Sequence, residues 1–312
     1  MQKSGVQVAI ANGRIEGLQF ERHQAFLGIP FAAPPTGPRR FCAPQPPHSW
    51  SGVRPANAFA NSAIQGTSPM PGTAASGPRD EDCLYLNVYT PAAGTAKRPV
   101  FFWIHGGGFT LGSGSEPLYD GSRLATRGDI VVVTIHYRLG ALGYLYLGAH
   151  GGEKWGATAN AGQLDQIAAL EWVRDNIARF GGDPANVTIA GESAGSMACA
   201  TLLAMPAARG LFRRAILQSG AANQLGGAAT GAKLAARVLE KLGIAEANAA
   251  KILDVPAEAI LQAQLAVAAT GTTLAFAPIV DGTTVPVNPL KAVAEGAARD
   301  VELVIGSNRD EA

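Results

Sequence analysis

A serine between two glycines is the feature of this sequence with the clearest chemical meaning. Ser193 lies in the pentapeptide G-E-S-A-G, residues 191–195, directly after the apolar run 186–190. This spacing after a strand-like run predicts a sharp turn between a buried strand and a helix, with the serine at its apex. A hydroxyl is an effective nucleophile only beside a base and near donors for an oxyanion. The pattern therefore predicts acyl-transfer chemistry with Ser193 as nucleophile.

A glycine-rich loop supplies the second half of the same chemistry. The apolar run 100–104 reads as a strand and opens into the loop H-G-G-G-F, residues 105–109. Such a loop after a strand is typical of an oxyanion hole, so we expect the backbone N–H groups of Gly107, Gly108 and Ala194 to converge on the developing charge. A phosphate-binding loop is the alternative, but neither a following Lys-Ser/Thr pair nor a G-x-G-x-x-G frame supports it.

The order of these and further motifs resembles the type-B carboxylesterase and lipase family, which includes the cholinesterases and belongs to the α/β-hydrolase superfamily. The resemblance covers residues 26–32, 38–41, 81–88, 105–109, 137–140, 176–184 and 191–195. Bacterial members of the para-nitrobenzyl esterase type look most similar. The resemblance implies an α/β-hydrolase fold, with helices flanking a mostly parallel twisted sheet. It also implies hydrolysis of small to medium apolar esters without a cofactor or metal ion.

The resemblance further implies a triad acid and neighbouring pocket residues. The family's acid is a glutamate just after the seventh strand of the sheet, and Glu311 in the stretch 306–311 matches that position, with Asp310 as the alternative. Glu192, next to the nucleophile, either tunes the electrostatics of the site or accepts a structural hydrogen bond. Ser219 follows another strand but lacks the second glycine of the elbow, so we expect it to line the pocket.

The triad histidine has no candidate at the expected place. In α/β-hydrolases the histidine follows the acid along the chain. All of the histidines precede Ser193, and they are His23, His48, His105, His136 and His150. His105 belongs to the oxyanion loop and His136 precedes a family motif, so each has a structural interpretation beside the catalytic one.

The missing histidine predicts that the 312 residues are the N-terminal portion of a longer enzyme. The last strand of the sheet and its helices would then be missing, and the strand 301–305 would form an unprotected edge. Loss of the base costs a serine hydrolase on the order of a millionfold in turnover, so we expect the isolated chain to be nearly inactive.

Composition agrees with a single α/β domain over residues 1–312. The chain is 47% hydrophobic and 16% charged, with a formal net charge of +1. This balance gives no electrostatic basis for binding nucleic acid or an anionic membrane. The sequence shows no signal-peptide core and no apolar stretch near the roughly 18 residues that span a bilayer. Cys42, Cys83 and Cys199 show no metal or disulfide spacing, which favours the cytoplasm.

Local patterns predict the elements that position the site. Asn12-Gly13 between two alternating runs predicts a hairpin. Short apolar runs predict buried parallel strands, at 100–104, 130–135, 187–190, 215–218 and 301–305. Apolar residues at helical spacing over 164–177 predict a helix that ends at Gly181-Gly182. An Ala-rich insert at 228–264, with breaks at Gly243 and Pro256, is expected to form part of a helical cap over the pocket.

Two ion pairs and two alternative functions complete the sequence-based expectations. Arg40 with Glu81, and Arg138 with Asp165, resemble internal ion pairs of the family and are expected to support the scaffold. A catalytically silent binding module is one alternative function, and the missing histidine favours it. Retention of Ser193 argues against it. An acyltransferase or amidase that uses the same acyl-enzyme is the other alternative.

Overall fold

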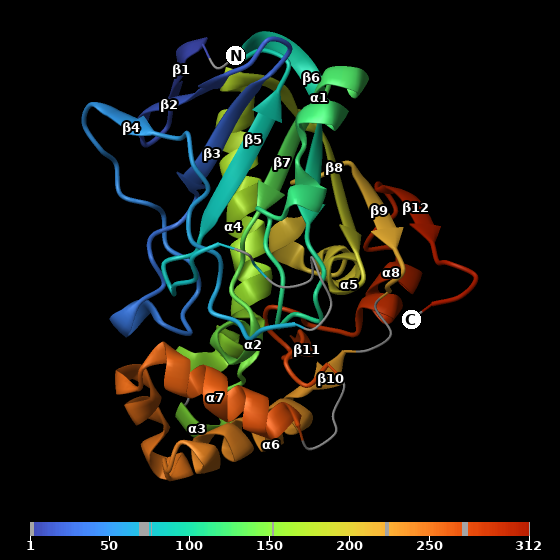
Figure 1. Ribbon diagram of the computed structural model, residues 1–312. Helices are drawn as coiled ribbons and strands as arrows, with labels where there is room; N and C mark the ends of the chain where they lie inside the picture. The colour runs from blue at the N-terminus through green and yellow to red at the C-terminus, as the bar shows by residue number, and fades with distance from the viewer. Residues whose placement is uncertain are drawn as a thin grey trace.

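The computed structural model describes residues 3–68, 75, 77–151, 153–221, 225–269 and 274–311. A twisted sheet crosses the molecule, with helices packed against it (Figure 1). Its strands are β1 (Lys3–Ile10), β2 (Gly13–Gln19), β3 (Gln24–Pro30), β4 (Val53–Pro55), β5 (Tyr85–Thr90), β6 (Gly94–Ile104), β7 (Val131–Ile135), β8 (Phe180–Glu192), β9 (Arg214–Gln218) and β12 (Glu302–Gly306). The order along the sheet is β1-β2-β3-β5-β7-β6-β8-β9-β12, and β4 pairs with β2.

α-Helices occupy the connections between strands from β6 onward. The α-helices are α1 (Ser122–Gly128), α2 (Gly140–Tyr144), α3 (Gly148–Gly151), α4 (Ala161–Asn176), α5 (Ala194–Leu202), α6 (Ala228–Lys241), α7 (Ala257–Ala268) and α8 (Pro289–Ala294). The longer 3-10 segments are η3 (Glu153–Asn160) and η7 (Glu246–Asp254). A small parallel pair, β10 (Gly226–Gly227) and β11 (Ile279–Val280), lies apart from the main sheet.

The parallel half of the sheet is built from the strands that the apolar runs predicted. Strands β7, β6, β8, β9 and β12 run parallel, whereas β5 is antiparallel to both β3 and β7. Each of the five predicted runs lies within one of the five parallel strands or overlaps it. The prediction of a mostly parallel sheet is therefore confirmed.

The predicted N-terminal hairpin is also present. β1 and β2 pair antiparallel, and Ile10 lies opposite Gly13 at the turn. Gly13 has a φ of 149°, which a residue with a side chain rarely adopts. The hairpin is therefore confirmed, but its two-residue loop is Ala11-Asn12, one residue earlier than the Asn-Gly dipeptide, because Gly13 already pairs with Ile10.

Two layers of apolar contacts hold the sheet. Val131 and Val133 of β7 belong to the main core, together with Leu170 and Val173 of α4. Val132 between them points to the opposite face and packs in a second, smaller cluster that includes α1. This alternation follows from the two-residue period of a strand, and it explains why β7, which is apolar except for the buried Thr134, is buried on both faces.

The helix predicted to end at Gly181-Gly182 ends earlier. α4 ends at Asn176, whose buried side chain accepts a hydrogen bond from Ala11 N and donates one to Trp172 O. The two glycines lie in β8, where Gly182 pairs with Arg98 of β6. A methyl group built on Gly182 would lie 2.8 Å from Ile177 Cγ1 and 2.9 Å from Val100 Cγ2. These glycines allow a close approach of β8 to its neighbours and do not terminate the helix.

β12 forms an edge of the sheet (Figure 1). Its apolar side chains are exposed, with Val304 and Ile305 each at 63% of their full accessible area. The expectation of an open strand edge at 301–305 is met in this structure. An exposed apolar edge strand offers unpaired N–H and C=O groups to any further strand.

The insert predicted at 228–264 is helical. It contains α6, η7 and most of α7, which continues to Ala268, and the breaks between them include Gly243 and Pro256 as predicted. Figure 1 shows α6 and α7 at the lower end of the molecule, toward which β8 and β9 run. None of the described helices combines the length and the apolar character needed to cross a bilayer.

Candidate active site

The sheet topology places a switch point at the carboxyl ends of β6 and β8. After β6 the chain continues into β7 on one side of it, and then returns to place β8 on the other side. The loops that leave β6 and β8 therefore diverge, and such switch points are where open α/β sheets bind ligands. The loop 105–109 follows β6 and Ser193 follows β8, so the topology brings the two predicted motifs to one place.

Ser193 has the strained conformation that the elbow pattern predicts. Its φ and ψ are 53° and −122°, and it directly precedes α5. A non-glycine residue in this region carries backbone strain, which proteins retain mainly at functional sites. Its backbone N–H donates to Gln218 O at 2.9 Å, and its side chain is half-buried.

Glycines bring the oxyanion loop against the elbow. A methyl group built on Gly106 would lie 2.8 Å from Glu192 O and 3.4 Å from Ser193 Cβ. Gly107 and Gly108 follow with φ values of 104° and 61°. Only glycine adopts the first of these readily, so the sequence H-G-G-G is what allows this loop to bend beside Ser193.

The other predicted residues lie along the same edge of the sheet. Ser219 follows β9 with a φ of 52°, and its N–H donates to Gly306 O at the end of β12 at 2.8 Å. Glu311 lies beyond β12, is exposed, and accepts a hydrogen bond from Asn308 N at 2.7 Å through Oε1. Because the strand order is β8-β9-β12, Ser193, Ser219 and Glu311 come from three successive strand ends.

Glu192 lies between the nucleophile and a cavity on the sheet. Partial burial raises the pKa of the Glu192 carboxyl, and the Glu311 carboxylate raises it further. A cavity of about 490 Å³ beside Glu192 is lined by Trp103, Tyr119 and Gln218, among others.

A residue of this region that the sequence did not reveal is Leu274. A methyl group built on Gly108 would lie 3.6 Å from Leu274 Cδ2. Leu274 itself has a φ of 56°, in the left-handed region that bulky residues rarely adopt. No local pattern marks a single leucine in the stretch that follows α7, so only the tertiary structure shows that it reaches the oxyanion loop.

A profile of the carboxylesterase family matches residues 4–312. The chain belongs to the carboxylesterase family. Para-nitrobenzyl esterase of Bacillus subtilis is 47% identical over 304 residues, which cover 96% of this chain and 61% of that protein. Fumonisin B1 esterase of Sphingopyxis macrogoltabida is 42% identical over 305 residues, which cover 96% of this chain and 55% of that protein.

Solved structures of carboxylesterases give the same picture. A crystal structure of a Geobacillus stearothermophilus carboxylesterase superposes with a TM-score of 0.92 at 45% identity, and the match covers 98% of this chain and 62% of that one. The α/β-hydrolase fold predicted from the motifs is therefore confirmed. The chain spans about three fifths of the length of the relatives named here.

His105 and His136 of this carboxylesterase chain have structural partners. His105 Nδ1 lies 2.8 Å from Gly106 O, and its ring stacks on Tyr137 with centroids 4.5 Å apart. His136 Nδ1 lies 2.8 Å from Asn61 O, and Nε2 lies 2.7 Å from Ser115 Oγ. Among the residues that the structure describes, no histidine forms a hydrogen bond with Ser193.

Burial lowers the pKa values of both of these histidines. The pKa falls to about 3 for His105 and to about 4 for His136, from an ordinary value of 6.5. Desolvation disfavours the imidazolium, so both rings are neutral near pH 7. In the neutral tautomer that donates from Nδ1, His136 accepts a hydrogen bond from the Ser115 hydroxyl.

Acid should therefore destabilise this fold. A lowered folded-state pKa means that the unfolded chain binds protons more readily, so stability is fully present above pH 6.5 and is lost as pH falls toward 4. We expect His136→Asn to reduce the loss of unfolding free energy between pH 7 and pH 5 by about 2 kcal/mol. Urea unfolding at both pH values measures this. An unchanged difference between the two pH values would show that His136 is not a source of the acid sensitivity.

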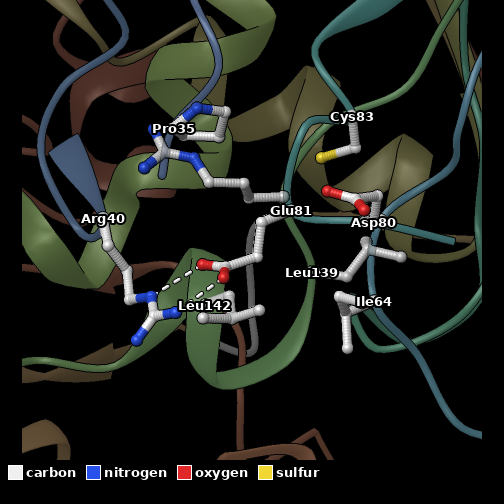
Figure 2. A pocket seen from close by; sticks show the side chains of 10 residues that line it. Pro35, Arg40, Ile64, Asp80, Glu81, Cys83, Leu139 and Leu142 are labelled. Atoms are coloured by element: carbon white, nitrogen blue, oxygen red, sulfur yellow. Dashed lines mark hydrogen bonds and ion pairs between the residues drawn. The ribbon is translucent and has the colours of Figure 1, made fainter. Parts of the chain in front are cut away.

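The two predicted ion pairs are present and belong to the scaffold. Arg138 and Asp165 are 2.7 Å apart and almost fully buried. Figure 2 shows Arg40 and Glu81, whose two hydrogen bonds of 2.6 Å join the guanidinium to both carboxylate oxygens. The cavity beside this pair is about 10 Å³, which is room for about one water molecule. It is too small for an ester substrate.

Proposed function

We propose that this chain carries the nucleophile and the oxyanion hole of a serine carboxylic-ester hydrolase. The observation that carries the proposal is the meeting of the strained Ser193 elbow with the glycine loop at Gly106. Membership of the carboxylesterase family supports it independently. The two motifs are separated by more than 80 residues of sequence, and a chance glycine-rich turn would not be expected to meet a second one.

In the proposed reaction, Ser193 Oγ attacks the carbonyl carbon of the ester and forms a tetrahedral intermediate. The negative charge develops on the former carbonyl oxygen, where the N–H groups of Gly107, Gly108 and Ala194 donate. The bond to the alcohol oxygen then breaks, and the alcohol leaves with a proton. Water attacks the acyl-enzyme in the same way and releases the carboxylic acid and free Ser193.

The proton of Ser193 needs a base that the described histidines do not supply. In α/β-hydrolases the histidine follows the acid along the chain, so we propose that it comes from a segment beyond Glu311 in a longer form of the protein. Glu311 would orient and stabilise that histidine. The position of Glu311 after β12, two strands from β8, supports this role. Asp310 remains the alternative acid.

We propose small to medium apolar esters, of the para-nitrobenzyl or para-nitrophenyl type, as substrates. The similar proteins named para-nitrobenzyl esterase and fumonisin B1 esterase both act on esters by name. Leu274 beside Gly108 gives this region an apolar wall. We also propose that the insert 228–264 is part of a cap over the site, because Leu274 follows its last helix and reaches the oxyanion loop.

The wall formed by Leu274 gives a prediction about acyl size. Leu274→Ala removes three carbon atoms next to the oxyanion loop. Hydrolysis of esters with bulky acyl groups should therefore become faster relative to hydrolysis of acetyl esters. We expect the ratio of kcat/KM for a bulky over a small para-nitrophenyl ester to rise about tenfold. Leu265→Ala is the control, because Leu265 is 42% exposed on α7. An unchanged ratio would remove Leu274 from the acyl site.

The free cysteines support a proposal for the cellular compartment of the protein. Cys42, Cys83 and Cys199 are all free thiols, and the last two are buried. Burial raises the pKa of both buried thiols, which keeps them protonated. We propose the cytoplasm, where free thiols are retained.

Intact-mass spectrometry after exposure to a para-nitrophenyl ester and, separately, to an organophosphonate tests the function. An adduct on Ser193 with sustained release of nitrophenol means that a base works within these 312 residues. An adduct without sustained turnover means that acylation occurs but deacylation lacks its base. No adduct from either reagent, in this chain and in one extended by a C-terminal segment, contradicts the esterase proposal.

A further inference from the structure

The side chain of Gln65 makes a set of contacts that the proposed mechanism does not use. It is 2% exposed and lies in the loop between β4 and β5. Its Nε2 donates to Gly112 O and its Oε1 accepts from Gly112 N, both at 2.9 Å. The same amide also donates to Ala63 O and accepts from Ala75 N, at 3.1 Å each. All four hydrogen-bonding positions of the amide are therefore filled.

The contact with Gly112 has the form of a peptide pairing. A side-chain amide offers one carbonyl and one NH2 group side by side, and Gly112 presents both of its backbone groups to them. A carboxylate would lack the donor, and a thioether would lack a strong donor and a strong acceptor alike. Only glutamine has both groups at this reach, since asparagine is one methylene shorter.

Gly112 is in turn packed against the oxyanion loop. Its φ is 105°, and a methyl group built on it would lie 2.6 Å from Gly106 O and 2.5 Å from His105 Nδ1. Gly107 O accepts from Leu111 N at 2.9 Å. The loop thus leaves β6, turns at Gly107, and closes on itself at Gly112, where the Gln65 amide holds it.

The segment that carries Gln65 is itself fixed. Arg79 donates to Gln65 O at 2.9 Å and to Gly66 O at 3.1 Å through Nη1. Asn61 O, four residues before Gln65, lies 2.8 Å from His136 Nδ1. The Gln65 side chain can hold Gly112 in place only if its own backbone is fixed, and these contacts fix it. We call the hydrogen bonds between the Gln65 amide and Gly112 the clamp.

We propose that Gln65 is a positioning residue of the oxyanion hole. Its amide holds Gly112, and so fixes the direction of the N–H groups of Gly107 and Gly108 before an ester binds. The role in catalysis rests on the proposed function, because a preorganised donor pair matters only where an oxyanion forms. The clamp itself is a property of the fold and can be tested separately.

Loss of the clamp should weaken the stabilisation of the transition state. Hydrogen bonds to the oxyanion strengthen as the charge develops, so misdirected donors lower kcat and leave KM nearly unchanged. A residue that merely supports the fold would lower the amount of active protein and its thermal stability, with the remaining protein working normally. The division between kcat and KM therefore distinguishes positioning from structural support.

The test compares Gln65→Met with a matched control, Asn176→Leu. Asn176 is also a buried side-chain amide that bridges two backbone groups, Ala11 N and Trp172 O, but neither belongs to the site. Hydrogen–deuterium exchange of the peptide covering residues 105–112 is followed in both variants. Loss of the two bonds to Gly112 should speed exchange there about tenfold or more in Gln65→Met. Asn176→Leu should leave that peptide at the wild-type rate.

A second variant keeps the test decisive if Gln65→Met does not fold. Gln65→Glu retains the shape of the side chain, and a buried carboxyl has a raised pKa. When protonated it can both accept from Gly112 N and donate to Gly112 O. We therefore expect protection of residues 105–112 to be lost at pH 8 and partly restored at pH 6. Equal protection in all variants and at both pH values would overturn the clamp.

Steady-state kinetics distinguish failure of the Gln65 positioning role from failure of the proposed esterase function. Where the wild-type chain turns over a para-nitrophenyl ester, Gln65→Met should lower kcat about 100-fold with KM within about twofold. A kcat equal to that of Asn176→Leu overturns the positioning role even if exchange is faster. If neither this chain nor one extended by a C-terminal segment shows turnover or adduct, the proposed function fails, and the exchange result alone decides whether Gln65 holds the loop.

Discussion

Ser193→Ala is expected to abolish the covalent adduct with an organophosphonate and to lower any ester turnover by about a millionfold. The reason is that no acyl-enzyme forms without the Oγ atom, and only binding and the oxyanion donors then remain. The fold should be unaffected, because alanine differs from serine by one oxygen and meets the same backbone strain at a φ of 53°. Intact-mass spectrometry and nitrophenol release measure the two outcomes.

Ser219→Ala is the matched control for this prediction. Ser219 also follows a strand of the parallel sheet, has a φ of 52°, and is half-buried. The Ser219→Ala variant should form the phosphonate adduct on Ser193 at a rate within about tenfold of the wild type. The reason is that Ser219 lacks the second glycine of the elbow and is expected only to line the pocket. An adduct retained in Ser193→Ala and lost in Ser219→Ala would move the nucleophile to the end of β9.

Gly195→Ala is expected to destabilise the fold by about 3 kcal/mol or more. Its added methyl group would lie 2.1 Å from Ile104 O and 2.9 Å from His105 O, both of them backbone atoms of β6 and its loop. Backbone cannot turn aside as a side chain can, so α5 would have to move away from β6. That movement would also separate Ser193 from the oxyanion loop. Urea unfolding gives the free energy, and phosphonate labelling reports the site.

Gly77→Ala provides the comparison for the cost of a methyl group. Within the described part of the chain, nothing lies within 4 Å of a methyl group built on Gly77, and its φ is not in the left-handed region. The same substitution there should change the unfolding free energy by less than about 1 kcal/mol. If Gly195→Ala proved equally mild, the close contact between α5 and β6 would not describe the protein in solution.

Several elements could be predicted because their causes are local. Asn12-Gly13 predicts a hairpin because both residues favour tight turns, and the structure forms it with Gly13 at the first paired position of β2. The apolar runs 100–104 and 130–135 predict strands because a strand buried on both faces has few polar positions. The elbow at Ser193 carries its own signature, since glycines on either side permit an otherwise forbidden approach. In each case the deciding residues lie within a few positions of one another.

The sequence-based predictions were wrong or absent where residues distant in the sequence determine the local structure. The end of α4 depends on Ala11 N, which bonds the Asn176 side chain from 165 residues away. The sequence predicted that Gly181-Gly182 ends the helix, but in the structure these glycines allow β8 to pack closely on its neighbours. Leu274 and Gln65 carried no local pattern, because Leu274 acts through its contact with Gly108 and Gln65 through its hydrogen bonds to Gly112, both far away in the sequence.

By itself the sequence determined the family, the mostly parallel sheet, and the two glycine-rich motifs that carry the chemistry. It did so because strands, turns and the nucleophile elbow are specified by short-range sterics and by the period of burial. Only the tertiary structure decided that Gly106 meets Ser193, that Leu274 walls the oxyanion loop, and that Gln65 holds Gly112. Those contacts join segments tens to hundreds of residues apart, and their geometry follows from how β6 and β8 lie side by side at the switch point of the sheet.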